Sequence, residues 1–286
     1  MLGRRGTLPF LAVPAYLWLV LLFVAPLLLA VAISFRPAGG PIDVAHLWLP
    51  SLIEYQKVAD SPTWLRLLGV SALMALVIAS AATVFAFPVA YFLAFRARDR
   101  AAVFLVLLLV PFATSYLLRV MAWKLLLGST GVINSFLIFI GVIDEPIRLL
   151  LYSQAAVIIT LVYVWIPFAA LPIYAALQRI YRSHLEAAAD LGSGPWTRFR
   201  RVTIPLSLPG VLATFFMVFI PTVGEYVTPS LVGGTGGIMY GNLIQDFFTR
   251  AGNWPLGSAL AVIMLVLTLV LVAVALRVID LRRVVA

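Results

Sequence analysis

Residues Leu185 to Pro205 read LEAAADLGSGPWTRFRRVTIP and form the longest polar interruption in the second half of an otherwise almost continuously apolar chain. This stretch carries five charged side chains, two acidic and three basic. Charged groups are costly to bury in lipid, so a chain that spans a membrane keeps such a segment at the aqueous surface. The stretch is therefore predicted to be an exposed loop that is available to a partner.

The composition is that of an integral membrane protein. Of the 286 residues, 63% are hydrophobic and 11% are charged, whereas soluble proteins carry about 25% charged residues. The mean hydropathy is +1.09. The chain has room for several spanning helices of about 20 residues each, and it leaves no stretch for a separate soluble catalytic domain. Residues 1–286 are predicted to form a single all-α transmembrane domain.

Charge-free windows define six predicted spans. Backbone polar groups in lipid must be satisfied within their own segment, and no alternating pattern typical of a membrane barrel is present. Arg4 and Arg5 resemble the start of a signal peptide, but the charge-free run that follows is too long for one. An uncleaved first span is therefore expected. The six helices are predicted near residues 13–35, 68–95, 101–121, 153–176, 206–228 and 256–277.

The charged residues are distributed unequally between the two sides of the membrane. With the N-terminus in the cytoplasm, thirteen basic and four acidic residues fall on the cytoplasmic side, and seven of each fall outside. The entire net charge of +9 then lies on one side, as the positive-inside rule requires. Both termini and the loop at about residues 179–205 are therefore predicted to be cytoplasmic. No nucleic-acid partner is needed to explain the basic charge.

Local signals predict the shape of this loop. Ser183 and Glu186 have the spacing of a capping box at a helix start, and Gly192 stands where a helix end commonly requires a positive φ. Ser193 is predicted to cap a second short helix with Pro195 in its first turn. Two short helices joined by a small-residue bend form a projection that another protein can bind. An amphipathic helix resting on anionic lipid would show the same pattern, so both interpretations stay open.

Several kinds of chemistry are excluded by residues that the chain lacks. It contains no cysteine, so it has neither a disulfide framework nor a thiolate metal site. Its only lysines, Lys57 and Lys124, do not follow a glycine-rich turn of the kind that holds nucleotide phosphates. His46 and His184 are predicted on opposite faces of the membrane. The chain is therefore predicted not to be an enzyme and to hold no cofactor or metal of its own.

The loop resembles a known family motif. Glu186, Ala187 and Ala188 are followed after three residues by Gly192, and nine residues later by Val202-Thr203-Ile204-Pro205. This resembles the EAA motif of permease subunits of bacterial ABC importers, EAA-x3-G-x9-I-x-L-P, with two conservative departures. The resemblance implies a cytoplasmic coupling helix between the fourth and fifth spans. The coupling residues would be Glu186, Ala187, Ala188, Gly192, Pro195, Arg198 and Pro205.

The same resemblance implies the partners and the location. The chain would lie in the bacterial inner membrane, in contact with lipid. It would bind two copies of a cytoplasmic ATP-binding subunit, a second permease subunit and a periplasmic solute-binding protein. ATP and Mg²⁺ would be bound by the ATP-binding subunits, and solute would move by alternating access driven by ATP hydrolysis there.

Further segments resemble the first permease of spermidine/putrescine importers. They are Arg119–Lys124, Gly131–Asn134, Ile143–Pro146, Gly224–Pro229, Gly241–Asp246 and Asn253–Gly257. A polyamine is a flexible polycation, so its path should offer carboxylates and aromatic faces, the latter contributing about 0.5 to 2 kcal/mol through cation–π attraction. The candidate pathway residues are Trp123, Glu225, Tyr226 and Asp246.

Alternatives stay open for these assignments. Glu225 could instead form a structural ion pair with Arg119 or Lys124. Permeases on similar frameworks carry iron, thiamine, sulfate or opine-type solutes. An ion-driven secondary transporter is less consistent with the sequence, because such proteins need buried acids or a sodium site within their spans. A purely structural scaffold would not explain the capped, glycine-hinged loop.

Overall fold

The computed structural model describes residues 8–37, 50–147 and 150–278, and within these ranges the regular structure is entirely helical. Arg4, Arg5 and His46 lie outside the described residues. Six helices in the described part are long and apolar enough to cross a membrane, so the prediction of an all-α chain with six spans is confirmed. They are Tyr16–Ser34, Pro62–Ala97, Tyr116–Phe139, Gln154–Gln178, Pro195–Val223 and Trp254–Arg277.

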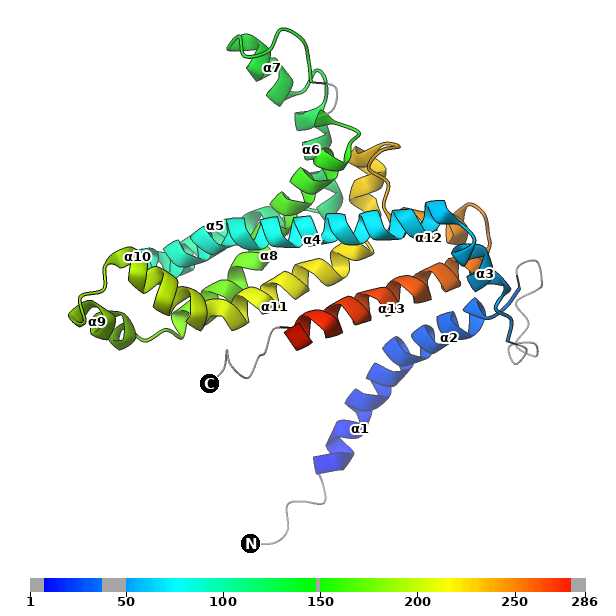
Figure 1. Cartoon of the computed structure of the whole chain (residues 1–286), viewed down its shortest axis with the longest axis horizontal. Helices are drawn as coiled ribbons and strands as arrows, with labels where there is room; N and C mark the ends of the chain where they lie inside the picture. Colours follow the sequence, from blue (N-terminus) through cyan, green and yellow to red (C-terminus); the bar gives the residue numbers. More distant parts are fainter. Residues whose placement is uncertain (1–7, 38–49, 148–149, 279–286) are drawn as a thin grey trace, which may run out of the picture. The chain divides into compact units, whose positions relative to one another are not determined.

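The third span differs from the prediction of one continuous helix over 101–121. The chain forms α5 (Ala101–Leu109), a 3₁₀ turn (Val110–Ala113) and then α6 (Tyr116–Leu127). Pro111 lies in the 3₁₀ turn, and Thr114 directly after the turn is extended. Proline lacks the N–H that continues a helix ladder, so the helix ends there and restarts in a new direction (Figure 1). The shorter helix α7 (Val132–Phe139) follows α6.

The chain divides into two compact units, Met1–Arg66 with Leu243–Leu267, and Leu67–Asn242 with Thr268–Ala286. In the first unit, the Ser34 hydroxyl at the end of α2 lies 2.7 Å from the Tyr55 hydroxyl on α3. The rings of Trp64 and Phe247 meet edge to face at 5.5 Å. Helices of this unit are α1 (Leu8–Leu19), α2 (Ala25–Ser34) and α3 (Ile53–Ala59). Helices α4 (Pro62–Tyr91), α12 (Tyr240–Thr249) and α13 (Trp254–Val278) include residues of both units.

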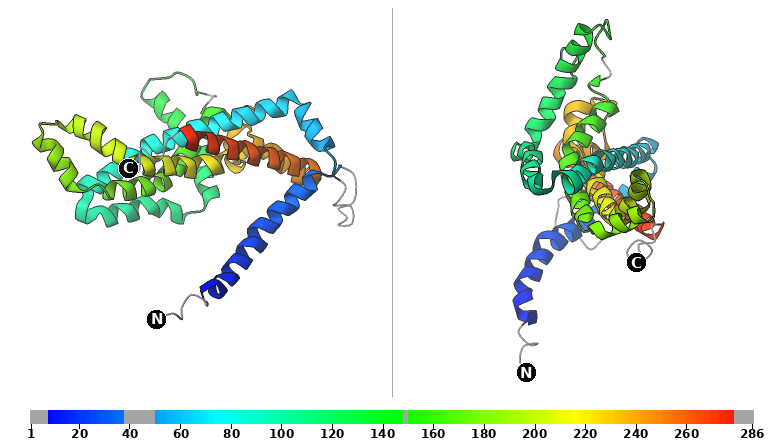
Figure 2. Two further views of the ribbon diagram at one scale, coloured as in Figure 1. Left: turned by 60° about the horizontal axis from the view of Figure 1, so that its bottom comes forward. Right: turned by 90° about the vertical axis from the view of Figure 1, so that its left-hand side faces the viewer.

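The centre of the second unit is the pair α8 (Gln154–Gln178) and α11 (Ile204–Val223), which lie side by side (Figures 1 and 2). Gly210 stands where they approach most tightly, because a Cβ there would overlap Ala176 and lie 3.1 Å from the Pro172 carbonyl oxygen. One turn further, the Thr214 hydroxyl lies 3.3 Å from the carbonyl oxygen of Ala169. Small residues allow this approach, which replaces the hydrophobic driving force that lipid cannot supply.

The predicted loop lies at one end of this helix pair (Figure 1). It contains α9 (Arg182–Asp190) and α10 (Pro195–Arg198), and a π-helical turn at Phe199–Thr203 continues α10 directly into α11. A second π-helical turn, Phe92–Ala97, ends α4. The fifth span therefore begins inside the loop, earlier than the predicted residue 206, so the loop and the span form one continuous helical segment.

We predict that Gly210→Ala destabilises the protein by about 1 to 3 kcal/mol, because an added methyl group overpacks the α8–α11 contact. Thermal unfolding of the purified protein in detergent would measure the loss. Gly69→Ala on α4 is the matched control, since a Cβ at Gly69 meets nothing within 4 Å. Adding Ala176→Gly to Gly210→Ala should restore part of the stability, whereas strictly additive effects would argue against this contact.

Candidate functional site

Gly192 ends α9 with a φ of +78°, as the sequence predicts. The Gly192 N–H bonds the Ala189 carbonyl at 2.8 Å, and the Ser193 N–H bonds the Ala188 carbonyl at 3.0 Å. This is the hydrogen-bond pattern of a Schellman motif, which satisfies the last carbonyls of a helix. The bend between α9 and α10 is therefore a closed, hydrogen-bonded turn.

The two predicted side-chain caps of this loop are wrong. Helix α9 begins at Arg182, one residue before Ser183, and its N-cap is Tyr181, whose side chain makes no capping bond. Ser183 therefore lies inside the first turn and the capping box with Glu186 is not formed. The N-cap of α10 is Gly194, not Ser193, although Pro195 does occupy the first turn. Glu186 is consequently exposed and is not held by the start of its own helix.

The structure brings several predicted coupling residues together around one depression. This depression, of about 450 Å³, lies between α9 and the start of α11, and its lining includes Ala187, Ala188 and Pro205. Gly192 and Pro195 are exposed at the bend beyond it. Apolar side chains also face solvent around the loop: Tyr181, Leu191 and Trp196 are 74%, 87% and 71% exposed. An apolar surface exposed on a polar projection marks a place where a partner binds.

Aromatic contacts fix the loop to α4. The Phe199 ring lies edge to face against Phe87 and Tyr91 at 5.9 and 5.7 Å, and Trp196 stacks on Phe199 at 5.5 Å. Arg198, the remaining predicted coupling residue, has a buried Nε without a hydrogen-bond partner. The loop is therefore attached to α4 through rings and to α11 through continuous backbone.

Glu225 follows the other end of α11, directly after Gly224. Its carboxylate oxygen Oε1 accepts hydrogen bonds from the backbone N–H groups of Val227 and Thr228, at 2.9 and 3.1 Å. The side chain thus satisfies the donors of the turn that leads into the π-helical segment Pro229–Gly233. Glu225 is half-buried.

The alternative ion pair of Glu225 with Arg119 or Lys124 is not formed. The Arg119 guanidinium lies 4.4 Å from the centre of the Phe112 ring, and the Lys124 ammonium lies 5.8 Å from that of Tyr152. Both cations are therefore placed over aromatic faces, where the ring quadrupole attracts them.

A tyrosine on α6 approaches the Glu225 turn. The Tyr116 hydroxyl lies 2.6 Å from the Thr228 hydroxyl and close to the Glu225 carboxylate. Trp123 lies two turns further along the same face of α6 and packs against Tyr163 of α8, with ring centres 5.3 Å apart. Helix α6 therefore places Tyr116 beside the carboxylate, whereas Trp123 packs on α8.

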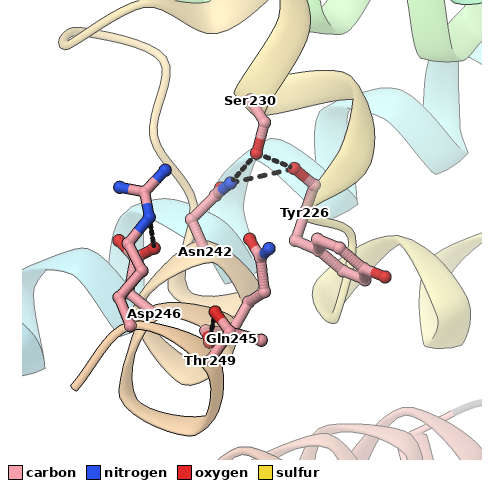
Figure 3. A network of polar contacts seen from close by, with 7 residues as sticks. Tyr226, Ser230, Asn242, Gln245, Asp246 and Thr249 are labelled. Atoms are coloured by element: carbon pink, nitrogen blue, oxygen red, sulfur yellow. Dashed lines mark hydrogen bonds and ion pairs between the residues drawn. The ribbon is translucent and has the colours of Figure 1, made fainter. Parts of the chain in front are cut away.

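Asn242 organises the connection after α11 (Figure 3). Its side-chain amide donates to the Tyr226 carbonyl at 2.8 Å and to the Ser230 hydroxyl at 2.7 Å, while its carbonyl accepts from the Met239 N–H at 3.0 Å. Gly241 beside it has no room for a Cβ, because the carbonyls of the Gly224 turn lie against it. This buried network holds the Tyr226 backbone in place, and the Tyr226 side chain is 43% exposed.

Asp246 belongs to the other compact unit. It forms an exposed ion pair at 3.4 Å with Arg250, the residue that follows the end of α12 (Figure 3). Only Oδ1 of Asp246 takes part in this ion pair, and the side chain is 47% exposed, so the carboxylate is accessible to solvent. Glu225 and Tyr226 thus lie near Tyr116. The ion pair of Asp246 is with Arg250, in the other compact unit.

Sequence reasoning missed Tyr116, Thr228 and Asn242. Tyr116 and Thr228 are 112 residues apart, and a polar contact of that range leaves no periodic signal. Asn242 could have been noticed, because a buried asparagine beside glycine is a common means of pairing irregular backbone.

Comparisons with known proteins agree with this arrangement. The family model of the "Binding-protein-dependent transport system inner membrane component" matches residues 3–285. The chain is 36% identical over 245 residues to the spermidine/putrescine transport system permease protein PotB of Escherichia coli K12, covering 86% of this chain and 88% of that protein. The Haemophilus influenzae protein of the same name is 34% identical over 257 residues, covering 90% and 88%.

Solved structures share the fold. A bacterial ABC transporter that imports the acidic polysaccharide alginate aligns with a TM-score of 0.68 at 16% identity, covering 96% of this chain and 95% of that chain. The MetNI methionine ABC transporter, in an inward-facing conformation, aligns with a TM-score of 0.53 at 18% identity, covering 78% and 99%. With its six apolar spans and a family match over nearly its whole length, the chain belongs to the family of binding-protein-dependent transport system inner membrane components.

Proposed function

We propose that this chain is a permease subunit of an ABC importer for polyamines such as spermidine and putrescine. The observation that carries the proposal is the 36% identity to a spermidine/putrescine permease over 86% of the chain. The half-buried carboxylate of Glu225 and the aromatic side chains of Tyr116 and Tyr226 near it suit a flexible polycation, because ammonium groups are attracted by both. The chain itself is a transport subunit and contributes no catalytic residue.

The proposed orientation places both termini and the α9–α10 loop in the cytoplasm. Two copies of an ATP-binding subunit would bind there, and ATP and Mg²⁺ would be held by those subunits. A second permease subunit would complete the pathway, and a periplasmic solute-binding protein would deliver the solute to the opposite side. The uneven distribution of basic residues supports this orientation.

The geometry of the loop suggests how motion would be transmitted. A partner that displaces α9 acts on a bend closed by two backbone hydrogen bonds at Gly192, so α9 and α10 move together. Because α10 continues into α11, the displacement enters the fifth span directly. The tight contact at Gly210 then carries it to α8. Packed helices move as rigid elements, so a shift at the loop reorients the helix pair.

Coupling is tested at Gly192. We predict that Gly192→Pro lowers uptake per ATP hydrolysed at least about tenfold in reconstituted vesicles, because proline cannot adopt the φ of +78° found there. Glu186→Lys should act in the same direction if the exposed carboxylate contacts the ATP-binding subunit. Both uptake of labelled spermidine and phosphate release would be measured.

Gly192→Asn is the matched control, since asparagine tolerates positive φ and a Cβ at Gly192 meets nothing within 4 Å. It should retain most of the coupling. Glu186→Gln separates loss of charge from charge reversal. Unchanged coupled uptake in Gly192→Pro would contradict the proposed role of the loop.

The solute assignment is tested at Glu225. We predict that Glu225→Gln raises the spermidine concentration for half-maximal uptake about tenfold, because a neutral amide loses a charge-assisted interaction. The amide oxygen can still accept the two backbone hydrogen bonds, so the turn should stay folded. Uptake in vesicles and thermal unfolding in detergent would measure the two effects separately.

Glu145→Gln provides the same change of charge at an exposed position between α7 and α8. It should leave half-maximal uptake nearly unchanged. An equal shift in both variants would indicate a general surface-charge effect, and no shift in either would remove Glu225 from the solute pathway.

A further inference from the structure

An apolar groove separate from the coupling depression lies between α4 and the beginning of α11. It encloses about 280 Å³, and its walls include Val84, Phe87 and Pro88 on α4 and Ile204, Leu208 and Val211 on α11. All these residues belong to one compact unit. Val84 is 66% exposed and Ile204 is 38% exposed, so the groove opens onto the surface of this unit.

One end of the groove is basic and aromatic. Arg200 precedes Ile204 by one helical turn, and so lies on the side of the helix that Ile204 and Leu208 contribute to the groove. Among the residues that the structure describes, no carboxylate forms an ion pair with Arg200.

Tyr91 and Trp196 meet Phe199 at the same end, as part of the aromatic cluster described above. Arginine with tyrosine and tryptophan at the end of an apolar surface is the composition found at the headgroup level of a membrane. The groove itself is lined mainly by bulky side chains, whereas tight helix contacts in membranes prefer small ones. Its shape and charge therefore fit a lipid better than another helix.

We propose that this groove binds one anionic phospholipid. One of its acyl chains would lie along Val84, Phe87 and Leu208, and its phosphate would be held by Arg200. The proposed function enters only in assigning the site to the cytoplasmic leaflet. Because the groove joins α4 to the helical segment that connects the loop with α11, a bound lipid would brace the region through which coupling acts.

The test uses the assembled transporter, purified in detergent with its co-expressed subunits, stripped of lipid and titrated with phosphatidylglycerol or phosphatidylcholine. Native mass spectrometry would count bound lipid. The wild type should bind phosphatidylglycerol about fivefold more tightly than phosphatidylcholine, as expected for one basic residue at an anionic headgroup. Arg200→Gln should abolish this preference and Arg200→Lys should keep it. Val84→Trp, at an exposed position, should fill the groove and lower binding of both lipids.

Arg277→Gln is the matched control, because Arg277 is an exposed arginine at the end of α13, away from the groove lining. It should leave the preference unchanged. Equal loss in Arg200→Gln and Arg277→Gln, or no loss in either, would overturn the proposal.

The competing occupant can be detected directly. Since the chain has no cysteine, Val84→Cys introduces a single thiol into it. Efficient cross-linking of this thiol to the second permease would show that protein fills the groove and would overturn the lipid site. None of these measurements depends on polyamine uptake, so the lipid site and the proposed function fail or succeed separately.

Discussion

Lipid offers no hydrogen-bond partner to a peptide group, and this constraint shapes the chain from end to end. Its spans are helical because a helix satisfies its own backbone. At two interruptions between helices, a buried asparagine side chain forms hydrogen bonds with the backbone N–H and C=O groups that lack a helical partner. Asn134 accepts from the Ile147 N–H and donates to the Gly128 carbonyl at 2.8 and 2.9 Å, and Asn242 does the same for the turns after α11. At these two turns, asparagine side chains replace helical hydrogen bonds.

Because the spans lie in lipid, their helices associate mainly through close packing. Apolar side chains gain little by leaving lipid for protein, so α8 and α11 associate where Gly210 lets their backbones approach. A contact of this kind has little tolerance for sliding, since moving either helix would bring a larger residue than Gly210 against Ala176 and Pro172.

The loop between α8 and α11 combines a rigid interior with an adaptable surface. Backbone bonds at Gly192 close its bend, and Phe199 attaches it to α4, while Leu191 and Trp196 remain exposed. The basic residues beside it serve a different purpose. They belong to the side that the positive-inside rule predicts to be cytoplasmic, and Arg200 precedes the groove residue Ile204 by four positions.

The sequence by itself determined the membrane class, the six apolar segments, the distribution of charge and the positive φ at Gly192. These features depend on composition and on local backbone chemistry, which a window of residues contains. It could not determine that α9 starts at Arg182, because the exit of α8 sets that boundary and removes Ser183 from the capping position. It also predicted one helix where Pro111 separates two.

The surroundings of Glu225 were decided only by tertiary structure. The sequence left open a pair with Arg119 or Lys124, and opposite charges at matching ends of two helices made that pair reasonable. In the folded chain those cations lie over Phe112 and Tyr152, and Glu225 caps its own turn beside Tyr116. The choice depends on the direction in which α6 leaves the break at Pro111, and such a direction follows from packing between distant segments.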